Sequence, residues 1–175
     1  MQTNFTLAQM GDPDIANAND ILRACVHCGF CTATCPTYVL LGDELDSPRG
    51  RIYQIKDMLE KAAPASPKIV KHIDRCLSCM SCMTTCPSGV DYMHLVDHGR
   101  AYIERTFRRP LMDRCLRQVL ATLLPRPGLF RVALLAAWAA RPFAKWAPGR
   151  LGAMLRLAPS QPTSPSSMDR PQIFR

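Results

Sequence analysis

Cysteine is the residue type through which this sequence most plainly offers chemistry. Eight of the nine cysteines fall in two runs of the same form, C-x2-C-x2-C-x3-C-P. The first run is Cys25–Pro36 and the second is Cys76–Pro87, and each cysteine of the first lies 51 positions before its counterpart in the second. This doubled spacing predicts two equivalent metal-binding loops.

The spacing within each run is typical of bacterial proteins that carry two iron–sulfur clusters. Three thiolates at three-residue intervals on a tight loop can bind three irons of a cubane, and the fourth cysteine of each run then ligates the other cluster. We therefore expect two [4Fe–4S] clusters, with the prolines stopping each loop from continuing as a helix. The expected ligand sets are Cys25, Cys28, Cys31 and Cys86 for one cluster, and Cys76, Cys79, Cys82 and Cys35 for the other.

Structural zinc and disulfide bonds are the two alternatives for so many cysteines. Four-cysteine zinc sites usually combine two separated C-x2-C pairs rather than three cysteines in succession. Disulfides need an oxidising compartment, and residues 1–14 lack the basic and apolar segments of a secretory signal peptide. The sequence favours clusters, in a cytoplasmic or similarly reducing compartment.

The chain has no recognisable motif for binding a nucleotide or for activating a serine nucleophile. The patterns G-x-G-x-x-G, G-x-x-x-x-G-K-[ST] and G-x-S-x-G are all absent from it. We therefore expect a protein that moves single electrons and contains no catalytic residue of its own for oxidising an organic substrate.

Capping residues and prolines mark the helices that must position the two loops. Asp12-Pro13 begins a helix that leads to the first loop, and Asp46-Ser47-Pro48 begins another within the 40 residues between the loops. A short helix after Pro67 leads into the second loop, and a fourth helix is expected at about 91–107. The expected apolar stripes are Ile15, Ala18, Ile21 and Leu22; Ile52, Ile55 and Leu59; Ile69, Val70 and Ile73; and Met93, Val96, Tyr102, Ile103 and Phe107.

These helices lie where a small ferredoxin has β-hairpins, so we predict an all-α fold. Residues 12–109 are expected to form an α-helical ferredoxin domain for the two clusters, preceded by a loose or partner-bound tail over residues 1–11. Residues 110–158 are predicted to form a basic, amphipathic helical extension. Residues 159–175 are rich in serine and proline and are expected to form a linker.

Three polar residues near the loops have two open interpretations each. His27, inside the first loop, could tune a cluster through its polarity, but we favour a half-exposed loop residue. Arg49 and Arg51 lie in the first turn of their helix, where the helix dipole disfavours cations. Either they face a cluster thiolate or an acidic partner, or they are simply solvated.

Three further candidate metal ligands have a simpler interpretation. His94 and His98 are four residues apart and could share one face of a helix, but no third ligand is near them in the sequence, so we interpret them as a polar face. Cys115 lies on the apolar side of the extension, and both clusters already have four cysteines. It is therefore expected to be a small buried hydrophobe rather than a ligand.

The basic residues are concentrated in the extension. The formal net charge is +8, which two clusters with their thiolates would reduce to about +4. Eight cations and no acid occur from Arg114 to Arg156, and the apolar run Val132–Ala140 is far shorter than the roughly 20 residues that span a bilayer. Such a segment can pack against another subunit or domain, or lie on an anionic membrane surface. We do not expect a nucleic-acid partner.

Two stretches of the sequence resemble a known family. They are RACVHCGFCTATCPTYVLLGDELDSPRGRIYQIKDMLE and RCLSCMSCMTTCPSGVDY, and they are similar to the iron–sulfur subunit of bacterial glycolate oxidase (glycolate dehydrogenase). More widely, that subunit resembles the iron–sulfur subunits of anaerobic glycerol-3-phosphate dehydrogenase and heterodisulfide reductase. The likeness is strongest from about residue 21 to 109, and the GDELDSPRGRIY stretch narrows it to the glycolate branch.

The resemblance implies a complex in which FAD-containing subunits oxidise glycolate to glyoxylate. This chain would pass the electrons through two [4Fe–4S] clusters towards the respiratory quinone pool, from a peripheral position on the inner face of the cytoplasmic membrane. Family members continue into two cysteine-rich domains with CCG motifs, and this sequence has no adjacent cysteine pair. We therefore expect it to correspond to the N-terminal electron-transfer part. A related lactate or glycerol-3-phosphate dehydrogenase, or a heterodisulfide-reductase-like complex, is the first alternative, and a zinc-stabilised interaction protein the second.

Overall fold

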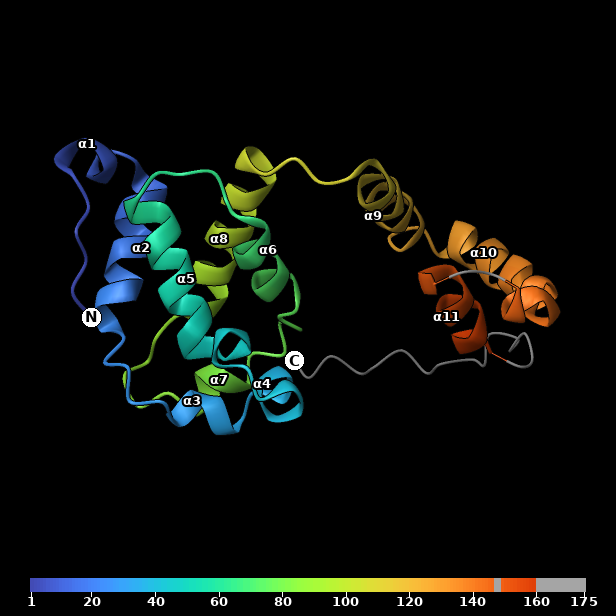
Figure 1. Ribbon diagram of the computed structural model, residues 1–175, viewed down its shortest axis with the longest axis horizontal. Coiled ribbons are helices and arrows are strands. Elements are labelled where there is room, and N and C mark those ends of the chain that lie inside the picture. The colour runs from blue at the N-terminus through green and yellow to red at the C-terminus, as the bar shows by residue number, and fades with distance from the viewer. Residues whose placement is uncertain (147–148, 160–175) are drawn as a thin grey trace, which may run out of the picture. The chain divides into compact units, whose positions relative to one another are not determined.

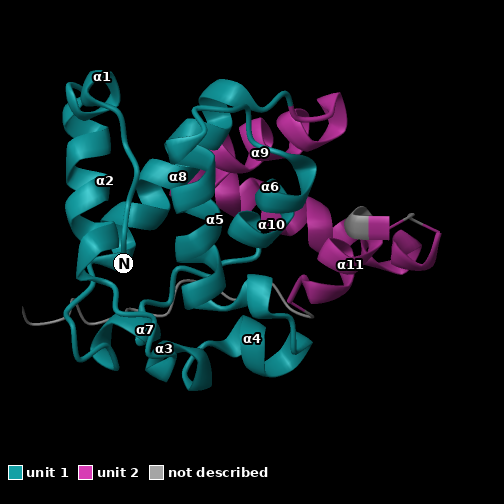
Figure 2. Cartoon of the chain, turned by 60° about the vertical axis from the view of Figure 1, so that its left-hand side comes forward, with its two compact units in different colours: residues 1–108 teal, residues 109–175 magenta. Residues whose placement is uncertain are grey.

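The computed structural model describes residues 1–146 and 149–159 (Figure 1). The chain divides into two compact units, residues 1–108 and residues 109–175 (Figure 2). Every regular element in the described ranges is an α-helix or a 3-10 helix, so the all-α prediction is confirmed.

Unit 1 contains four longer helices and several short ones that surround the cysteine loops. In Figure 1 the short helices α3, α4 and α7 gather at one end of this unit. In chain order, the elements are α1 (Leu7–Met10), α2 (Pro13–Ala24), α3 (Phe30–Ala33), α4 (Pro36–Leu41), η1 (Glu44–Asp46), α5 (Pro48–Glu60), α6 (Pro67–Asp74), α7 (Ser81–Thr84) and α8 (Tyr92–Thr106).

The longer helices begin where the sequence predicts. In α2, α5 and α6 the first residue is a proline, and the residue before it caps the helix with its side chain. Ser47, for example, accepts a hydrogen bond from the backbone N–H of Gly50 at 2.9 Å. Asp91 caps α8 in the same way. These local signals place the starts of the helices, two of which, α2 and α6, lead into the cysteine loops.

The core of unit 1 lies where α5 packs against α8, with α2 and α6 beside them. Gly99 of α8 allows this close approach, because a Cβ at this position would lie 3.0 Å from the side chain of Ile55. Met93, a predicted core residue, is 40% exposed because the buried stripe of α8 runs through Leu95 and Val96 instead. The most deeply buried apolar residues are Ala18, Leu22, Ile55, Ile73, Leu95, Val96 and Ile103.

Residues 1–11, expected to be loose or partner-bound, pack against the rest of unit 1. Thr6 and Gln9 form a capping box at the start of α1. The side-chain amide of Gln9 also donates to the backbone carbonyls of Leu59 and Glu60, at 3.0 and 3.2 Å. A helix end leaves such carbonyls without partners inside the helix, and a distant side chain satisfies them here.

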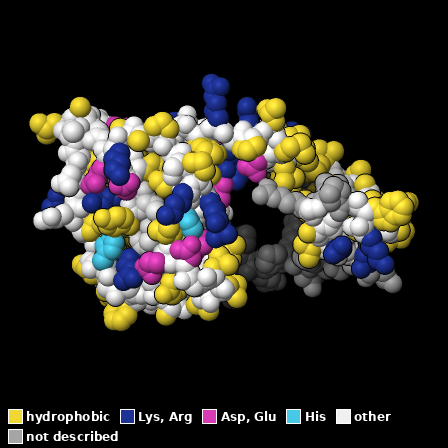
Figure 3. Space-filling model, viewed as in Figure 1, with side chains coloured by type: hydrophobic (Ala, Val, Ile, Leu, Met, Phe, Trp, Pro, Cys, Tyr) yellow, Lys and Arg dark blue, Asp and Glu magenta, His cyan; other side chains and the backbone are white. Residues whose placement is uncertain are grey.

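Unit 2 consists of amphipathic and apolar helices with much exposed hydrophobic surface (Figure 3). Its elements are α9 (Leu111–Leu123), α10 (Pro127–Ala140), η2 (Arg141–Lys145) and α11 (Gly149–Leu157). Pro127 occupies the first position of helix α10, where its missing N–H costs no hydrogen bond. None of the described helices has the length and hydropathy needed to cross a membrane. The predicted serine- and proline-rich linker lies outside the described residues, apart from Pro159.

Candidate metal centres

The two cysteine runs adopt the same backbone conformation. At the start of the loops, the N–H of Cys25 donates to the Leu22 carbonyl at 3.2 Å, and that of Cys76 donates to the Ile73 carbonyl at 3.1 Å. At their ends, Cys35 and Cys86 donate to the carbonyls three residues before them, both at 3.2 Å. The sequence repeat is therefore also a structural repeat.

Each loop contains two residues in the left-handed region of backbone space. In the first loop these are His27, with φ of 56°, and Gly29, with φ of 85°. The residues 51 positions later, Ser78 and Met80, have φ values of 53° and 57°. Left-handed backbone in a residue other than glycine costs about 1–2 kcal/mol, and such conformations concentrate at functional sites. Here they fold each loop tightly enough to bring its first three cysteines around one space.

Helices α3 and α7 pack together, and cysteines from both loops line the two cavities beside them. The first cavity, with an empty volume of about 460 Å³ including its open mouth, is lined by Cys25, Cys28, Cys31, Cys82 and Cys86. The second, with about 310 Å³, is lined by Cys35, Cys76, Cys79 and Cys82. The fourth cysteine of each run thus lines the cavity of the other run, and Cys82 borders both.

The chemistry of this donor set fits iron–sulfur clusters. Thiolates are soft ligands that select iron–sulfur clusters, zinc and cuprous copper. Burial, together with the nearby Cys31, Cys76 and Cys35, raises the pKa of Cys82 to about 12. Burial likewise raises the pKa of Cys31. Crowded, partly buried thiols of this kind become thiolates readily only when a cation binds among them.

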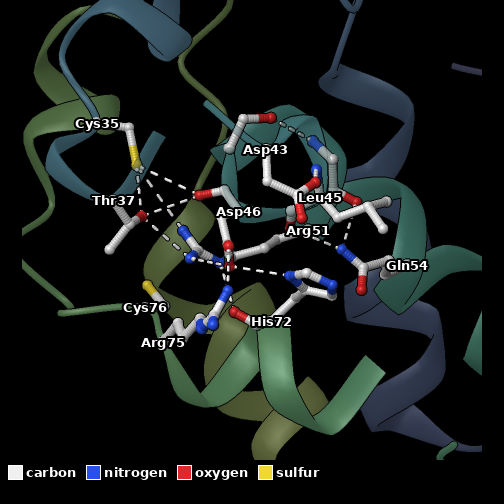
Figure 4. A network of polar contacts seen from close by, with 12 residues as sticks. Cys35, Thr37, Asp43, Leu45, Asp46, Arg51, Gln54, His72, Arg75 and Cys76 are labelled. Atoms are coloured by element: carbon white, nitrogen blue, oxygen red, sulfur yellow. Dashed lines mark hydrogen bonds and ion pairs between the residues drawn. The ribbon is translucent and has the colours of Figure 1, made fainter. Parts of the chain in front are cut away.

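The second cavity is bordered by a buried guanidinium group (Figure 4). Arg51 is 1% exposed, and its Nη1 lies 3.8 Å from the Sγ of Cys35. Its Nε donates to the His72 carbonyl at 2.8 Å, and its Nη2 donates to the Thr37 hydroxyl at 3.0 Å. Each nitrogen of this group therefore has a specific partner, which holds the guanidinium against the cysteine sulfur.

Asp46 anchors the same network from the opposite side. Its fully buried carboxylate contacts Arg51 at 3.4 Å, the Nδ1 of His72 at 3.0 Å and Arg75 at 2.7 Å. Burial acts to raise the pKa of Asp46, but the hydrogen bonds and charges of His72 and Arg75 hold it below its ordinary value. Asp43, Asp46 and His72 could geometrically surround a metal ion. Two guanidinium groups already occupy the Asp46 oxygens, so we interpret the cluster as an ion-pair network.

Other polar groups also face the second cavity. The hydroxyl of Tyr92 donates to the Sγ of Cys76 at 3.6 Å, and the hydroxyl of Thr37 lies 3.1 Å from the Sγ of Cys35. Hydrogen bonds from Ser81 lower the pKa of the Cys79 thiol. At least one polar side chain therefore accompanies three of the four cysteines that line this cavity.

The first cavity combines apolar residues with a half-exposed cation. Val26, Phe30, Ile52 and Val90 contribute to its wall. Arg49 lies beside this loop, but its side chain is 36% exposed and forms an ion pair with Glu44 at 2.7 Å.

Within the part of the chain that the structure describes, the other predicted candidates do not come together as a metal site. His27 is half-buried, with its ring edge-on to Tyr53, and burial followed by nearby positive charges lowers its pKa. His94 contacts Asp91, whereas His98 contacts Asn17, so the two histidines face different partners.

Cys115 is exposed, and the prediction that it is buried was wrong. The helix period placed it near apolar neighbours, but the described residues of unit 2 do not cover that part of α9. Sequence reasoning also missed Asp46, Thr37, His72, Arg75 and Tyr92. The only sequence signal for this network was the unfavourable position of two arginines at a helix start.

The comparisons with known proteins agree with this geometry. Residues 21–90 match the family described as the 4Fe-4S dicluster domain, a class of protein that fits the helical fold and the two cysteine loops. More particularly, the chain is similar to the glycolate oxidase iron-sulfur subunit of Escherichia coli (strain K12), with 53% identity over 143 residues. It is also similar to the probable glycolate oxidase iron-sulfur subunit of Bacillus subtilis (strain 168), with 34% identity over 98 residues. The resemblance inferred from the sequence is thus confirmed.

These matches cover a larger share of this chain than of either relative. They cover 82% and 55% of this chain, but only 35% and 22% of the respective relatives. The chain thus corresponds to about a third or less of each relative's length. No solved structure matches it significantly.

Proposed function

We propose that the chain is an electron-transfer iron–sulfur subunit that binds two [4Fe–4S] clusters through crossed cysteine sets. Cys25, Cys28, Cys31 and Cys86 would hold one cluster, and Cys35, Cys76, Cys79 and Cys82 the other. The observation that supports this most is the pair of cavities, each lined by cysteines from both loops. Once bound, each cluster supplies a one-electron carrier.

The roles of the protein's own residues follow from their positions. The cysteine loops hold the metal, and the surrounding hydrogen bonds and charges set how favourable each added electron is. We find no constellation for oxidising an organic substrate among the described residues. In this proposal, partner subunits that contain FAD oxidise glycolate to glyoxylate. This chain then passes the two electrons, one at a time, towards quinone.

We propose a position at the inner face of the cytoplasmic membrane for this complex. The described part of unit 2 carries exposed Trp138, Phe143 and Trp146 together with an excess of basic residues. Such a surface suits either another subunit or an anionic membrane surface.

Anaerobic purification followed by iron, zinc and acid-labile sulfide analysis tests the cluster proposal. We expect a brown protein with equal iron and sulfide, and an electron paramagnetic resonance signal after reduction with dithionite. The matched variants are Cys82→Ser, at both cavities, and Cys115→Ser, outside them. Only the first should lose iron. A colourless protein loaded with zinc would refute the proposal and favour a structural role.

Co-expression with flavoprotein subunits tests the substrate. We expect glycolate to reduce a dye through the reconstituted complex, and the reduction to depend on this chain. Faster reduction with lactate or glycerol 3-phosphate would assign the chain to a related dehydrogenase instead.

A further inference from the structure

The two cysteine cavities differ most in the charge and hydrogen-bond donors around them. The second cavity is bordered by Arg51, whose side chain is 1% exposed and lies 3.8 Å from the Cys35 sulfur. Arg49, two residues earlier, lines the first cavity, and its side chain is 36% exposed and paired with Glu44. One helix turn thus presents a buried cation to one cavity and a solvated cation to the other. A second cation binds the start of each loop: the Met1 ammonium donates to the Cys25 carbonyl at 2.6 Å, and Arg100 donates to the Cys76 carbonyl at 2.8 Å.

We infer that Arg51 makes the two clusters inequivalent and gives the cluster held by Cys35, Cys76, Cys79 and Cys82 the higher reduction potential. This inference rests on the proposed function, because it requires that both cavities hold clusters. It assigns Arg51 as a residue that stabilises the reduced state, and Asp46 and His72 as the residues that position it.

The physical argument begins with charge balance. Reduction adds one electron, which a reduced flavin or dithionite donates. The net charge of a cluster with its four thiolates then changes from about −2 to about −3. A nearby cation favours the more negative state. Because Arg51 is buried, solvent and salt screen its field far less than that of the exposed Arg49.

Arg51 is the member of the ion-pair network that reaches a cysteine sulfur, with its Nη1 3.8 Å from the Sγ of Cys35. Arg51 and Arg75 share the carboxylate of Asp46, and the carboxylate of Asp43 lies within 4.8 Å of it. These carboxylates offset guanidinium charge from the side away from the sulfur, and Asp46 holds Arg51 in place. An isolated buried arginine would be far costlier, which explains why the carboxylate is needed.

Hydrogen bonds to sulfur act in the same direction. The hydroxyl of Tyr92 donates to the Cys76 sulfur at 3.6 Å, and the Nη1 of Arg51 donates to the Cys35 sulfur at 3.8 Å. Such donors withdraw negative charge from the thiolates and raise the reduction potential. At equilibrium, the first electron to enter the protein would then reside in the second cavity.

A redox titration monitored by electron paramagnetic resonance tests this inference on the intact, cluster-loaded chain. We expect two midpoint potentials in the wild type. Arg51→Gln should lower the higher midpoint potential by at least about 59 mV, which is a tenfold change in the equilibrium constant of a one-electron reduction. The lower midpoint potential should stay nearly unchanged. Arg49→Gln is the matched control, because it removes the exposed cation from the same helix turn, and it should shift only the lower potential and by less.

Two milder variants keep the test decisive if Arg51→Gln does not fold. Tyr92→Phe removes only a hydroxyl and should lower the same midpoint that Arg51 controls. Arg51→Lys keeps the charge without the forked hydrogen bonds and should lower that midpoint by less than Arg51→Gln does.

The outcomes separate this inference from the proposed function. A wild-type protein without reducible clusters would refute the function itself. Clusters of equal potential, or a midpoint that none of the Arg51 and Tyr92 variants lowers, would overturn the inference and leave the function standing. A shift of the lower midpoint by Arg51 variants would also overturn it.

Discussion

The first and second cysteine loops have the same spacing and the same left-handed positions, but the surrounding side chains differ. Around the second cavity, Arg51, Thr37 and Tyr92 place buried polar groups close to sulfur. Around the first, an apolar wall is combined with the half-exposed Arg49. A repeated motif can therefore reproduce the ligand geometry twice while the rest of the fold gives each copy its own electrostatic environment.

The difference between the cavities is tested most directly by replacing the fourth cysteine of each run, one at a time. We expect Cys86→Ser to eliminate the first-cavity cluster and Cys35→Ser the second-cavity cluster, each with loss of about half the iron. Iron analysis and redox titration would show which midpoint disappears. Loss of the higher midpoint in Cys86→Ser would reverse the assignment of fourth ligands.

The next largest effect is expected for the anchor of the second cavity. Asp46→Asn leaves Arg51 buried without its carboxylate, and we expect the free energy of unfolding to fall by about 3–5 kcal/mol. Anaerobic urea denaturation followed by circular dichroism measures this change. Asp57→Asn, which breaks an exposed ion pair with Lys61, is the control and should have a far smaller effect.

The same carboxylate predicts a dependence of stability on pH. The folded state holds the pKa of Asp46 below its ordinary value, so its stabilising contribution is fully present above that ordinary value. It is lost as the pH falls through the lowered folded-state pKa. In acid, the difference in unfolding free energy between wild type and Asp46→Asn should therefore shrink. A difference that stays constant down to strongly acidic pH would contradict this linkage.

A smaller effect is expected at the glycine that distinguishes the first loop from the second. Gly29 has φ of 85°, and an added Cβ would lie 3.1 Å from Nη1 of Arg49. We expect Gly29→Ala to reduce the free energy of unfolding by about 1–2 kcal/mol. Gly42→Ala, at φ of 66° with open space around it, carries the backbone strain alone and should cost slightly less. Equal losses in denaturation would show that Arg49 moves away freely.

The smallest effects should be found where both loops carry the same threonine. Thr34 donates its hydroxyl to the Cys31 carbonyl three residues earlier, and Thr85 donates its hydroxyl to the Ser81 carbonyl four residues earlier, both at 3.2 Å. Removing either hydroxyl with alanine should reduce the free energy of unfolding by about 1 kcal/mol. Similar values in denaturation would support equivalent loop backbones, whereas a large difference would place the asymmetry in the loops themselves.

Local chemistry in the sequence determined much of this protein. The spacing of Cys25–Pro36 and Cys76–Pro87 indicated the ligands and their chemistry, since three-residue intervals suit a cubane. Prolines preceded by capping residues placed the starts of α2, α5 and α6. Both signals act within a few residues, so they can be recognised before the chain is folded.

Only the tertiary structure decided which side chains surround each set of cysteines. Arg51 reaches Cys35 across 16 positions, and Asp46 reaches His72 and Arg75 across 26 and 29. Both arginines occupy the first turn of α5, and the helical period places Arg51 on the side of Ile52 and Ile55, which is buried. What that buried side meets, namely the Cys35 sulfur and the Asp46 carboxylate, depends on contacts between distant parts of the chain.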